Sequence, residues 1–496
     1  MLLALLAVAA TAAVAVAVAR QHGPRGATPV ASPSLVLVDA RRPTGAVVSP
    51  ALFGVGVDLS AATYARFTGS DCGALVGIGG AATLVRAGAD TADDYDWPTD
   101  TYDNPRDPST HGVDASHGCP PARDRAAASV LRVLDRVRAL RARAVVVLNG
   151  ETDDPQGAYR LAALIARRYG LAFARAIYWE IGNAPAQWQH FGIPLTARSA
   201  SEHINCSPDQ YAALVTGYHA AIAGALGASS APRGAPAGQG WPRIVADAWI
   251  TNATDQSWAG LVTAVDTRYY PYTTVGAGTG PASALDVARG VSRPPSGTIS
   301  LDDQLSSLRA SLDQYGGAGV RLFVGQWNIN AGASAVGPAY DSAGQAAFVA
   351  ALLTHAVRDG VVMAAWAPPL YGFTGFSQQA PIVDGGPTPG FRVFGTLRRL
   401  AGARILSMTV PPGRGLDGLA VRRPDGGVTI VLARTDGRGS IDVPLRLSGG
   451  PARPVWATVQ TFSATSDGTS RARSIDPVNA RISLPAPSVV IVTLPR

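Results

Sequence analysis

Eight apolar runs separated by amphipathic stretches constrain the fold of this chain more than any other feature. The runs are Phe53–Leu59, Thr83–Ala87, Ala144–Leu148, Ala176–Ile181, Arg243–Ala248, Ala264–Tyr270, Arg321–Gln326 and Val361–Trp366. Their length and composition are typical of buried strands. The stretches whose apolar residues recur at helical spacing are Asp124–Arg141, Pro155–Tyr169, Pro208–Leu226, Leu301–Tyr315 and Ser342–Arg358. This alternation predicts an α/β fold, a (β/α)8 TIM barrel with long loops; a doubly wound open sheet is the alternative.

The helical spacing stops after Leu400, and short β runs follow. They are Arg404–Val410, Gly418–Arg422, Val428–Ala433, Ile441–Leu447, Val455–Phe462 and Val489–Leu494. Turn residues separate these runs, which predicts a C-terminal antiparallel β-sandwich. We therefore expect a barrel over residues 34–400 and a sandwich over residues 401–496, with residues 34–48 pairing with the sandwich.

The first residues of the chain predict export. Residues 1–19 carry no charge and are apolar except for Thr11, and a linker over residues 20–33 follows them. The apolar stretch is just long enough to span a bilayer, and its small residues before Arg20 also fit a cleavage site. We expect a signal peptide or a membrane anchor, and hence a secreted or membrane-anchored, extracytoplasmic protein.

The basic charge of the chain does not indicate a nucleic-acid partner. The formal net charge of +7 comes from arginine alone, because the sequence contains no lysine. The arginines are scattered, and no nucleic-acid-binding motif is present. The glycine-rich segments lack the pattern of a phosphate-binding loop, and the histidines are dispersed. We therefore expect no cofactor and no metal.

Three cysteines suit an exported protein with one disulfide and one spare thiol. In a barrel, the loops that follow the strands meet at one face. Cys119 and Cys206 fall on two such loops, about Trp97–Arg123 and Asn183–Ser207, whereas Cys72 precedes a strand and belongs near the other end. We therefore predict a Cys119–Cys206 disulfide, although any pair of the three is open from sequence.

A series of motifs follows the strands in a fixed order. It consists of Leu84–Gly88 with Tyr95–Trp97, Val147–Gly150, Tyr178–Pro185, Arg268–Tyr272, Phe323–Asn328 and Pro387–Leu400. The run Trp179-Glu180-Ile181-Gly182-Asn183-Ala184-Pro185 is the most specific of them, and it resembles the WEIGNEP signature of the retaining (β/α)8 glycosidases. That clan includes arabinofuranosidases, β-xylosidases and heparanase-like glucuronidases. The resemblance covers nearly the whole chain.

The resemblance assigns the two catalytic carboxylates to positions that hold other residues here. It places the acid/base at Ala184 and the nucleophile at Gln326. A retaining glycosidase needs two carboxyl groups about 5–5.5 Å apart. A methyl group transfers no proton, and a neutral amide is a very poor nucleophile. Arg268 also stands where the family pattern has histidine, which is a third departure in one pocket.

The remaining motif residues could still hold a sugar. The resemblance implies that Asn183 hydrogen-bonds a hydroxyl beside the anomeric centre and that Arg86 orients it. Glu180 should be a buried, hydrogen-bonded acid. The residues that we expect to line the cleft are Arg86, Trp97, Asn183, Trp188, Tyr270, Gln326, Trp327 and Trp366. Their aromatic members can stack on a pyranose, although core packing is the common role of an aromatic side chain.

The sequence therefore predicts an exported, glycosidase-like protein that is catalytically inactive and binds an envelope or extracellular polysaccharide. The alternative is an active glycoside hydrolase with a relocated carboxylate, for which Asp58, Asp90, Asp93 and Asp94 are candidates. An active enzyme disabled by substitution would give the same sequence. A structural interaction protein, whose own loops fill the barrel mouth, is a further class.

Overall fold

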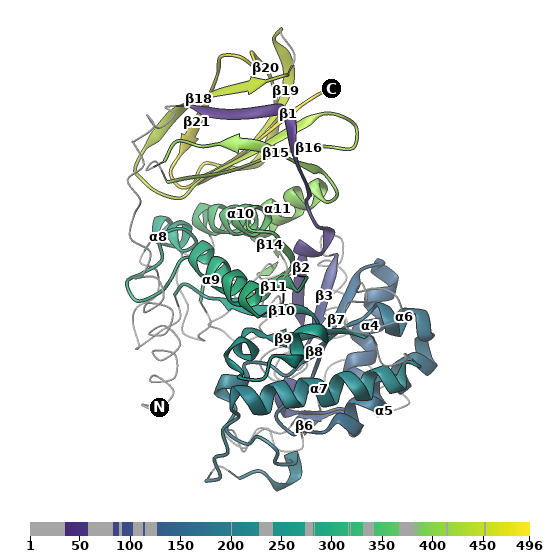
Figure 1. The fold of residues 1–496 in the computed structure, drawn as a ribbon. Coiled ribbons are helices and arrows are strands. Elements are labelled where there is room, and N and C mark those ends of the chain that lie inside the picture. Colours follow the sequence, from purple (N-terminus) through teal and green to yellow (C-terminus); the bar gives the residue numbers. More distant parts are fainter. Residues whose placement is uncertain are drawn as a thin grey trace.

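The computed structural model describes residues 35–57, 83–88, 92–102, 113–114, 126–199, 201–227, 242–272, 281, 283–315, 317, 319–330, 342–366, 382–383, 386–412, 415–450 and 453–496. These residues form a helix-surrounded barrel and a large β-sheet, with helices α10 and α11 between the two (Figure 1). The apolar stretch 1–19 and the linker 20–33 lie outside the described residues. Among the helices of the described ranges, none has the length and apolarity needed to cross a bilayer.

Eight parallel strands close the barrel. They are β2 (Gly54–Val57), β3 (Leu84–Ala87), β7 (Arg143–Leu148), β8 (Tyr178–Ile181), β9 (Arg243–Asp247), β10 (Val262–Tyr269), β11 (Arg321–Trp327) and β12 (Val361–Trp366). Each strand pairs in parallel with its two neighbours, and β12 pairs with β2 to complete the ring. The closed ring confirms the predicted TIM barrel and excludes the open doubly wound sheet.

The barrel interior is built in layers, because alternate residues of a strand point to the same side. One apolar layer takes a residue from each of seven barrel strands: Leu84, Val145, Tyr178, Val245, Ala264, Phe323 and Met363. Two residues further along β3, β8, β9 and β10, toward their carboxyl ends, stand Arg86, Glu180, Asp247 and Asp266. The period of the strands therefore places a charged layer directly above an apolar one.

The helices lie outside the barrel, with their apolar residues against its strands. The predicted helices are present as α4 (Ala128–Leu140), α5 (Pro155–Tyr169), α7 (Pro208–Ala225), α9 (Leu301–Gln314) and α10 (Ala343–Arg358). The sequence analysis missed α6 (Leu171–Ala176), α8 (Ala284–Arg289) and α11 (Pro389–Leu397). Because α6 ends at Ala176, β8 begins at Tyr178, two residues later than predicted.

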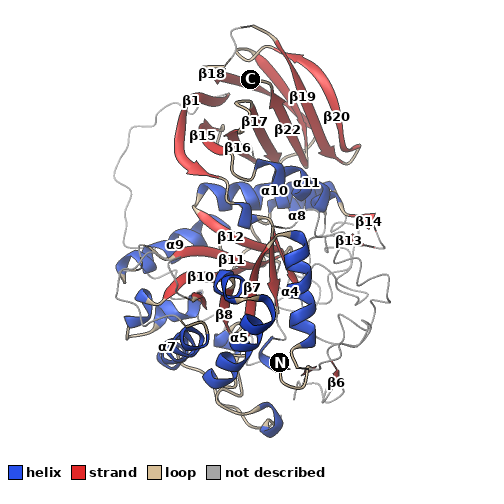
Figure 2. Cartoon of the chain, turned by 90° about the vertical axis from the view of Figure 1, so that its right-hand side faces the viewer, coloured by secondary structure: helices blue, strands red, loops and turns tan. Residues whose placement is uncertain are grey.

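Helix α10 is buried on all sides. Every residue from Ala343 to Val357 is buried. The helix contacts α8 and α11 of the barrel layer, and also strands of the large sheet (Figure 2). A helix that is apolar all round is stable only when protein covers every face. The run Ala346–Leu353 therefore marks the junction between the two parts of the molecule.

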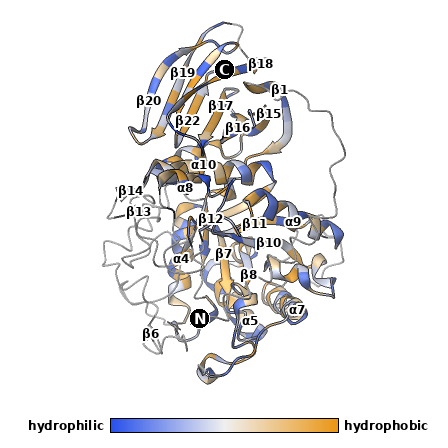
Figure 3. Ribbon diagram, turned by 90° about the vertical axis from the view of Figure 1, so that its left-hand side faces the viewer, coloured by the Kyte–Doolittle hydropathy of each residue, from blue (hydrophilic) through white to orange (hydrophobic). Residues whose placement is uncertain are grey.

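The large sheet has nine strands in the order β20-β19-β22-β17-β16-β15-β1-β18-β21 and is mostly antiparallel. Its strands are β1 (Val36–Val47), β15 (Arg404–Thr409), β16 (Leu416–Arg422), β17 (Val428–Arg434), β18 (Ser440–Ser448), β19 (Val455–Ser463), β20 (Ser466–Ile475), β21 (Ala480–Pro485) and β22 (Ser488–Leu494). Strand β1 pairs with β15 and β18, so the start of the described chain belongs to this sheet. The predicted C-terminal β-sandwich is confirmed, with two additional strands, β20 and β21. In Figure 3, β20 carries hydrophilic colour, whereas the barrel strand β7 is hydrophobic.

A histidine joins the barrel to the sheet. His355 of α10 bonds through Nδ1 to Asp302 of α9 and through Nε2 to Asp417 of β16, the latter at 2.7 Å. Arg358 lies beside the ring and pairs with Asp302, and Asp359 pairs with Arg358. Burial alone would lower the pKa of His355, but the hydrogen bonds to the two carboxylates outweigh it and raise the pKa to about 9. The protonated ring is therefore a cationic link between two domains.

This link makes stability depend on pH. The ordinary pKa of histidine is 6.5, so the contribution is complete below pH 6.5 and is lost as pH rises through about 9. We expect the free energy of unfolding to fall by up to about 3 kcal/mol between about pH 6.5 and about pH 10. Urea unfolding across this window measures the fall. The His355→Gln variant should be less stable at pH 6.5 and nearly flat above it; parallel curves for the two proteins would contradict this assignment.

Candidate functional site

A buried ion pair lies at the centre of the charged layer. Arg86 donates from Nε and Nη2 to the two carboxylate oxygens of Glu180, at 2.7 and 2.5 Å. The side chains of Arg86 and Glu180 are 0% and 1% exposed. A third bond from Arg86 reaches the carbonyl oxygen of Gly88 at 3.1 Å. Glu180 is the buried, hydrogen-bonded acid that the sequence analysis expected, and both its oxygens are occupied by arginine.

The side-chain oxygen of Asn183 joins this pair to a second arginine. It accepts from Arg86 Nη2 at 3.0 Å and from Arg268 Nη2 at 2.8 Å. The resemblance implied that Asn183 binds a sugar hydroxyl and that Arg86 orients it. In the structure Arg86 does hold Asn183, but the amide oxygen also accepts from Arg268. One oxygen therefore fixes two cationic side chains that come from β3 and β10.

Arg268 connects three polar groups at the mouth of the barrel. It donates from Nη1 to Asp247 Oδ2 at 2.6 Å and from Nε to Gln326 Oε1 at 3.2 Å, in addition to its bond to Asn183. Its side chain is 20% exposed, whereas Gln326 is 1% exposed. The Nε2 group of Gln326 is buried without a hydrogen-bond partner among the described residues. A ligand oxygen that reached this amide would satisfy it.

Asp266 lies below Arg268 and is fully buried. Its Oδ1 accepts from the backbone N–H of Gly325 at 2.5 Å. Burial, and then the charge of Glu180, raise the pKa of Asp266 well above its ordinary value. Residue 325 has to be glycine, because a Cβ there would lie 2.1 Å from Asp266 Oδ1. The charged layer thus contains two ion pairs and a third, fully buried acid, Asp266.

Ala184 follows Asn183 with a left-handed backbone, at φ 51° and ψ 58°. Only glycine adopts this conformation without strain, and asparagine and aspartate tolerate it better than alanine. Its methyl group can neither donate nor accept a proton. Ala184 therefore has a left-handed backbone but no side chain that could act as the acid/base.

Asp93 serves the backbone and not the cleft. It accepts from the N–H of Gly150 at 3.0 Å, the N–H of Asn183 at 2.8 Å and the indole N–H of Trp188 at 2.8 Å. Burial raises its pKa to about 7. Asp94 is instead paired with Arg198 at 3.2 Å. The other two candidates for a relocated carboxylate, Asp58 and Asp90, lie outside the described residues.

Three of the aromatic side chains that we predicted in the cleft are part of the core. Trp188, Trp327 and Trp366 are 4%, 0% and 1% exposed. Trp327 stacks on Trp366 with 4.9 Å between the ring centroids. The prediction that these faces stack on a sugar is wrong, because neighbouring side chains already cover them. Tyr270 and Trp97 are partly exposed, and only these two of the five aromatic candidates present accessible ring surface.

Trp97 lines a cavity of about 500 Å³ on the same face of the barrel. Tyr95, Leu148, Leu161, Gly192 and Tyr218 are also in its wall, and Asp96, Asp153 and Asp154 supply carboxylates. The Nδ2 group of Asn149, another wall residue, is buried and has no hydrogen-bond partner among the described residues. A half-buried indole beside carboxylates and an amide group that lacks a partner is suited to a sugar ring. We name this space the Trp97 cavity.

The predicted disulfide is not formed in the structure. Cys206 is a buried free thiol, and burial raises its pKa to about 12. Its predicted partner, Cys119, lies outside the described residues. Within the described part of the chain, no cluster of three His, Cys, Asp or Glu side chains could hold a metal ion.

The sequence analysis missed the two side chains that complete the network. It noted Arg268 as a departure from the family pattern but gave it no partner, and it did not single out Asp247 or Asp266. The available signal was the period of the strands, since Asp247 and Asp266 each follow an apolar interior residue by two positions.

Comparison with known proteins places this fold among the glycoside hydrolases. No protein-family model matches the chain, and no curated protein matches it. Among solved structures, it is similar to a GH51 arabinofuranosidase from Xanthomonas axonopodis pv. citri, with 19% identity, a TM-score of 0.65 and coverage of 93% of this chain and 99% of the other. A GH44 xyloglucanase from Paenibacillus polymyxa matches with 12% identity, a TM-score of 0.65 and the same coverage. An α-L-arabinofuranosidase from Thermotoga maritima matches with 15% identity, a TM-score of 0.63 and coverage of 92% and 99%.

At these identities the likeness shows the fold alone. The predicted resemblance to (β/α)8 glycosidases is therefore confirmed for the barrel and for the sheet that accompanies it.

The Arg86–Glu180 pair generates a stability prediction. Replacing Arg86 with methionine leaves the buried carboxylate without its main partner, which typically costs about 3–5 kcal/mol. Arg160→Met is the matched control, because the Arg160–Asp154 pair is 56% and 48% exposed and such surface pairs contribute at most about 1 kcal/mol. Urea unfolding of both variants measures the difference. An Arg86→Met cost no larger than that of the control would contradict the assigned role.

Proposed function

We propose that this chain is an exported glycoside-hydrolase-fold protein that binds an envelope or extracellular polysaccharide and does not hydrolyse it. The observation that carries the proposal is the environment of Gln326. The family resemblance assigns the nucleophile to this position. Here it is a buried amide held by Arg268, with no acid at Ala184 to protonate a leaving group.

The neighbouring carboxylates offer no obvious replacement. Glu180 is engaged by Arg86 through both oxygens, and Asp93 accepts three N–H groups of the loops. Asp247 pairs with Arg268 through one oxygen and caps the following 3-10 helix with the other, at 2.8 Å from the N–H of Trp249. The protein's own donors therefore already occupy oxygens of all three carboxylates, and a substrate would have to displace those donors to use them.

Arg268 also changes the electrostatics that a glycosidase requires. The transition state of glycoside cleavage resembles an oxocarbenium ion, which is positively charged at the anomeric carbon. An arginine in this pocket opposes that charge, whereas a nucleophilic carboxylate stabilises it. The same guanidinium is a good donor to sugar hydroxyls. The mouth of the barrel is therefore better suited to binding than to turnover.

The Trp97 cavity supports the binding half of the proposal. It lies on the face of the barrel where the loops after the strands gather, and in this fold ligands bind at that face. Its indole, its carboxylates and the Nδ2 group of Asn149 are groups that a pyranose can stack on and hydrogen-bond. The Nε2 group of Gln326 offers a further donor inside the mouth.

The absence of turnover is the first test. Purified protein should not release aryl aglycones from a panel of aryl glycosides above the rate of a buffer blank, while calorimetry with the corresponding oligosaccharides shows binding. Ordinary glycosidases turn over at about 1–10³ s⁻¹, so the difference is large. Turnover at such a rate, lost in Asp247→Asn or Asp93→Asn, would establish a relocated active site and overturn the proposal. The Ala184→Glu, Gln326→Glu double variant shows whether the pocket otherwise remains ready for catalysis.

The Trp97 cavity is the second test. Truncating Trp97 to alanine removes the stacking surface and should weaken oligosaccharide binding about tenfold. Trp456→Ala is the matched control, because Trp456 is 72% exposed on the large sheet and far from the barrel loops in sequence. Titration calorimetry of the two variants reports the affinities. Equal affinities for both would place the bound sugar elsewhere.

A further inference from the structure

The Trp97 cavity carries a charge opposite to that of the chain. The whole sequence has a net charge of +7 and contains 42 arginines. No arginine or histidine is among the described residues of the cavity wall, whereas Asp96, Asp153 and Asp154 are. Carboxylates without a cation in the same wall create a negative potential, which attracts a cationic group. The sign of this charge restricts what the cavity can bind.

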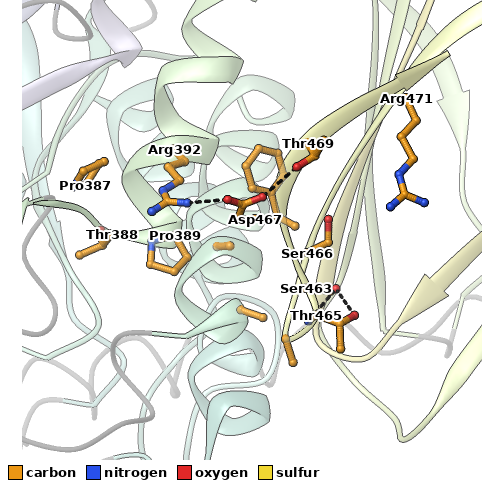
Figure 4. Close-up of a pocket in the computed structure, with 14 residues that line it drawn as sticks. Pro387, Thr388, Pro389, Arg392, Ser463, Thr465, Ser466, Asp467, Thr469 and Arg471 are labelled. Atoms are coloured by element: carbon orange, nitrogen blue, oxygen red, sulfur yellow. Dashed lines mark hydrogen bonds and ion pairs between the residues drawn. The ribbon is translucent and has the colours of Figure 1, made fainter.

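A second pocket has a different composition. It measures about 680 Å³ and lies between α10, α11 and the hairpin of β19 and β20 (Figure 4). Two arginines, Arg392 and Arg471, are among its lining residues, and Arg392 donates to Asp467 at 3.1 Å. Asp467 is the one acid among the described residues of that lining. Its carboxylate is already paired there, so it offers no comparable site for a cation.

Asp154 holds its carboxylate against the wall of the Trp97 cavity. It caps the start of α5, where its Oδ1 accepts from the backbone N–H of Gly157 at 2.7 Å. A Cβ on residue 157 would lie 2.3 Å from Asp154 Oδ2, so the carboxylate lies directly on this wall glycine. Arg160, which is not a wall residue, lies 3.3 Å from Oδ2, and the side chains of Arg160 and Asp154 are 56% and 48% exposed. Such a pair contributes about 0–1 kcal/mol, so a ligand cation can share Oδ2 at little cost.

Asp153 adds a carboxylate that forms no ion pair with a described residue. Its backbone has φ 49°, a left-handed conformation that aspartate and asparagine tolerate better than most residues. Burial, and then the charge of Asp154, raise the pKa of its carboxyl group. Two neighbouring carboxylates therefore repel each other in this part of the wall. A bound cation would relieve the repulsion.

The wall also contains groups that recognise a sugar. Trp97 is partly exposed, and an indole face binds both the apolar face of a sugar ring and a cation. Asn149 Oδ1 accepts from the backbone N–H of Thr152 at 3.2 Å. This bond orients the amide and leaves Nδ2 as the buried donor that lacks a partner among the described residues. A ligand hydroxyl oxygen would accept from it.

Tyr218 fixes the amide and the carboxylates relative to one another. Its hydroxyl donates to the carbonyl oxygen of Asn149 at 2.6 Å and accepts from the backbone N–H of Asp154 at 3.1 Å. The residue belongs to α7, which packs against α5, and it is 1% exposed. The polar groups of the wall are therefore held by two packed helices.

We propose that the Trp97 cavity binds a glycan that carries free amino groups. An ammonium group pairs with Asp153 and Asp154, the ring stacks on Trp97, and a hydroxyl accepts from Asn149. An inorganic cation would leave the indole and the amide unused, a neutral sugar gains no charge pairing, and the carboxylates repel a uronate. The inference rests on the proposed function, because it names the class of glycan that this site of the barrel accepts.

A purely structural role of the two aspartates has to be separated from this one. Asparagine also caps helices and also tolerates the left-handed conformation. The Asp153→Asn, Asp154→Asn double variant therefore removes two charges and keeps both backbone roles. The matched control is the Asp135→Asn, Asp313→Asn double variant. Both of these aspartates pair with partly exposed arginines, at 3.3 and 3.2 Å, and neither lines the cavity.

Titration calorimetry of the full chain at about pH 5.5 and about 0.15 M salt tests the proposal. The probes are the trimer of glucosamine, whose amines are protonated, and the trimer of N-acetylglucosamine, which is neutral. The wild-type protein and the control variant should bind the glucosamine trimer at least about tenfold more tightly than the acetylated trimer. In the Asp153→Asn, Asp154→Asn variant the two affinities should lie within about twofold of each other.

Trilysine, a cation without a sugar ring, should bind the wild-type protein at least about tenfold more weakly than the glucosamine trimer. Equal affinities of the two trimers for the wild-type protein, a preference that survives in Asp153→Asn, Asp154→Asn, an equal loss of preference in the control variant, or equal binding of trilysine would each overturn the proposal.

The proposed function fails or stands separately. Binding of both trimers without a preference for the amine overturns the assigned charge selection and leaves saccharide binding intact. Absence of binding by either trimer also overturns the amino-glycan proposal, whereas the proposed function falls only when none of the oligosaccharides in its own test binds.

Discussion

The buried pair of Arg86 and Glu180 is the interaction on which the mouth of the barrel depends. Two charges have been removed from water there, and the cost is tolerable only because both carboxylate oxygens are bonded by the guanidinium. The pair spans from β3 to β8 across β7, and its remaining donor fixes Asn183. Asn183 in turn fixes Arg268, which reaches Asp247 and Gln326. One chain of hydrogen bonds therefore links this salt bridge to Asn183, Arg268, Asp247 and Gln326.

The proposed absence of glycosidase activity rests on this network. Catalysis needs carboxyl groups poised to transfer a proton and to attack carbon, and their charge must be available to the substrate. Here the acids are engaged within the protein. Glu180 and Asp247 pair with arginines, Asp93 accepts from backbone N–H groups, and Asp266 is fully buried. The side chain at residue 326 is neutral and buried, and the one at residue 184 is a methyl group. Binding requires only donors, acceptors and accessible surface, and these remain.

The sequence predicted the barrel well, because its strands are short apolar runs that are buried on both faces and unmistakable in composition. Val145–Leu148 and Leu322–Val324 are examples. It missed β20, because Ser466–Ser474 is polar on both sides at the edge of a sheet and gives no alternation. It misplaced Trp327 and Trp366, since a motif cannot tell that two rings stack on each other instead of facing the cleft. The bond from Arg268 to Asp247 joins the neighbouring strands β10 and β9, and no local pattern encodes it. Residues that share a strand period were predictable, whereas side-chain bonds between strands were not.

The central claim is that the barrel mouth accepts a saccharide and leaves its glycosidic bond intact. A crystal structure of the wild-type protein soaked with an uncleaved oligosaccharide tests this most directly. The account predicts an intact sugar chain at the mouth, in contact with Trp97 or Gln326, and no covalent bond to any side chain. A cleaved product or a glycosyl group linked to a carboxylate would contradict it.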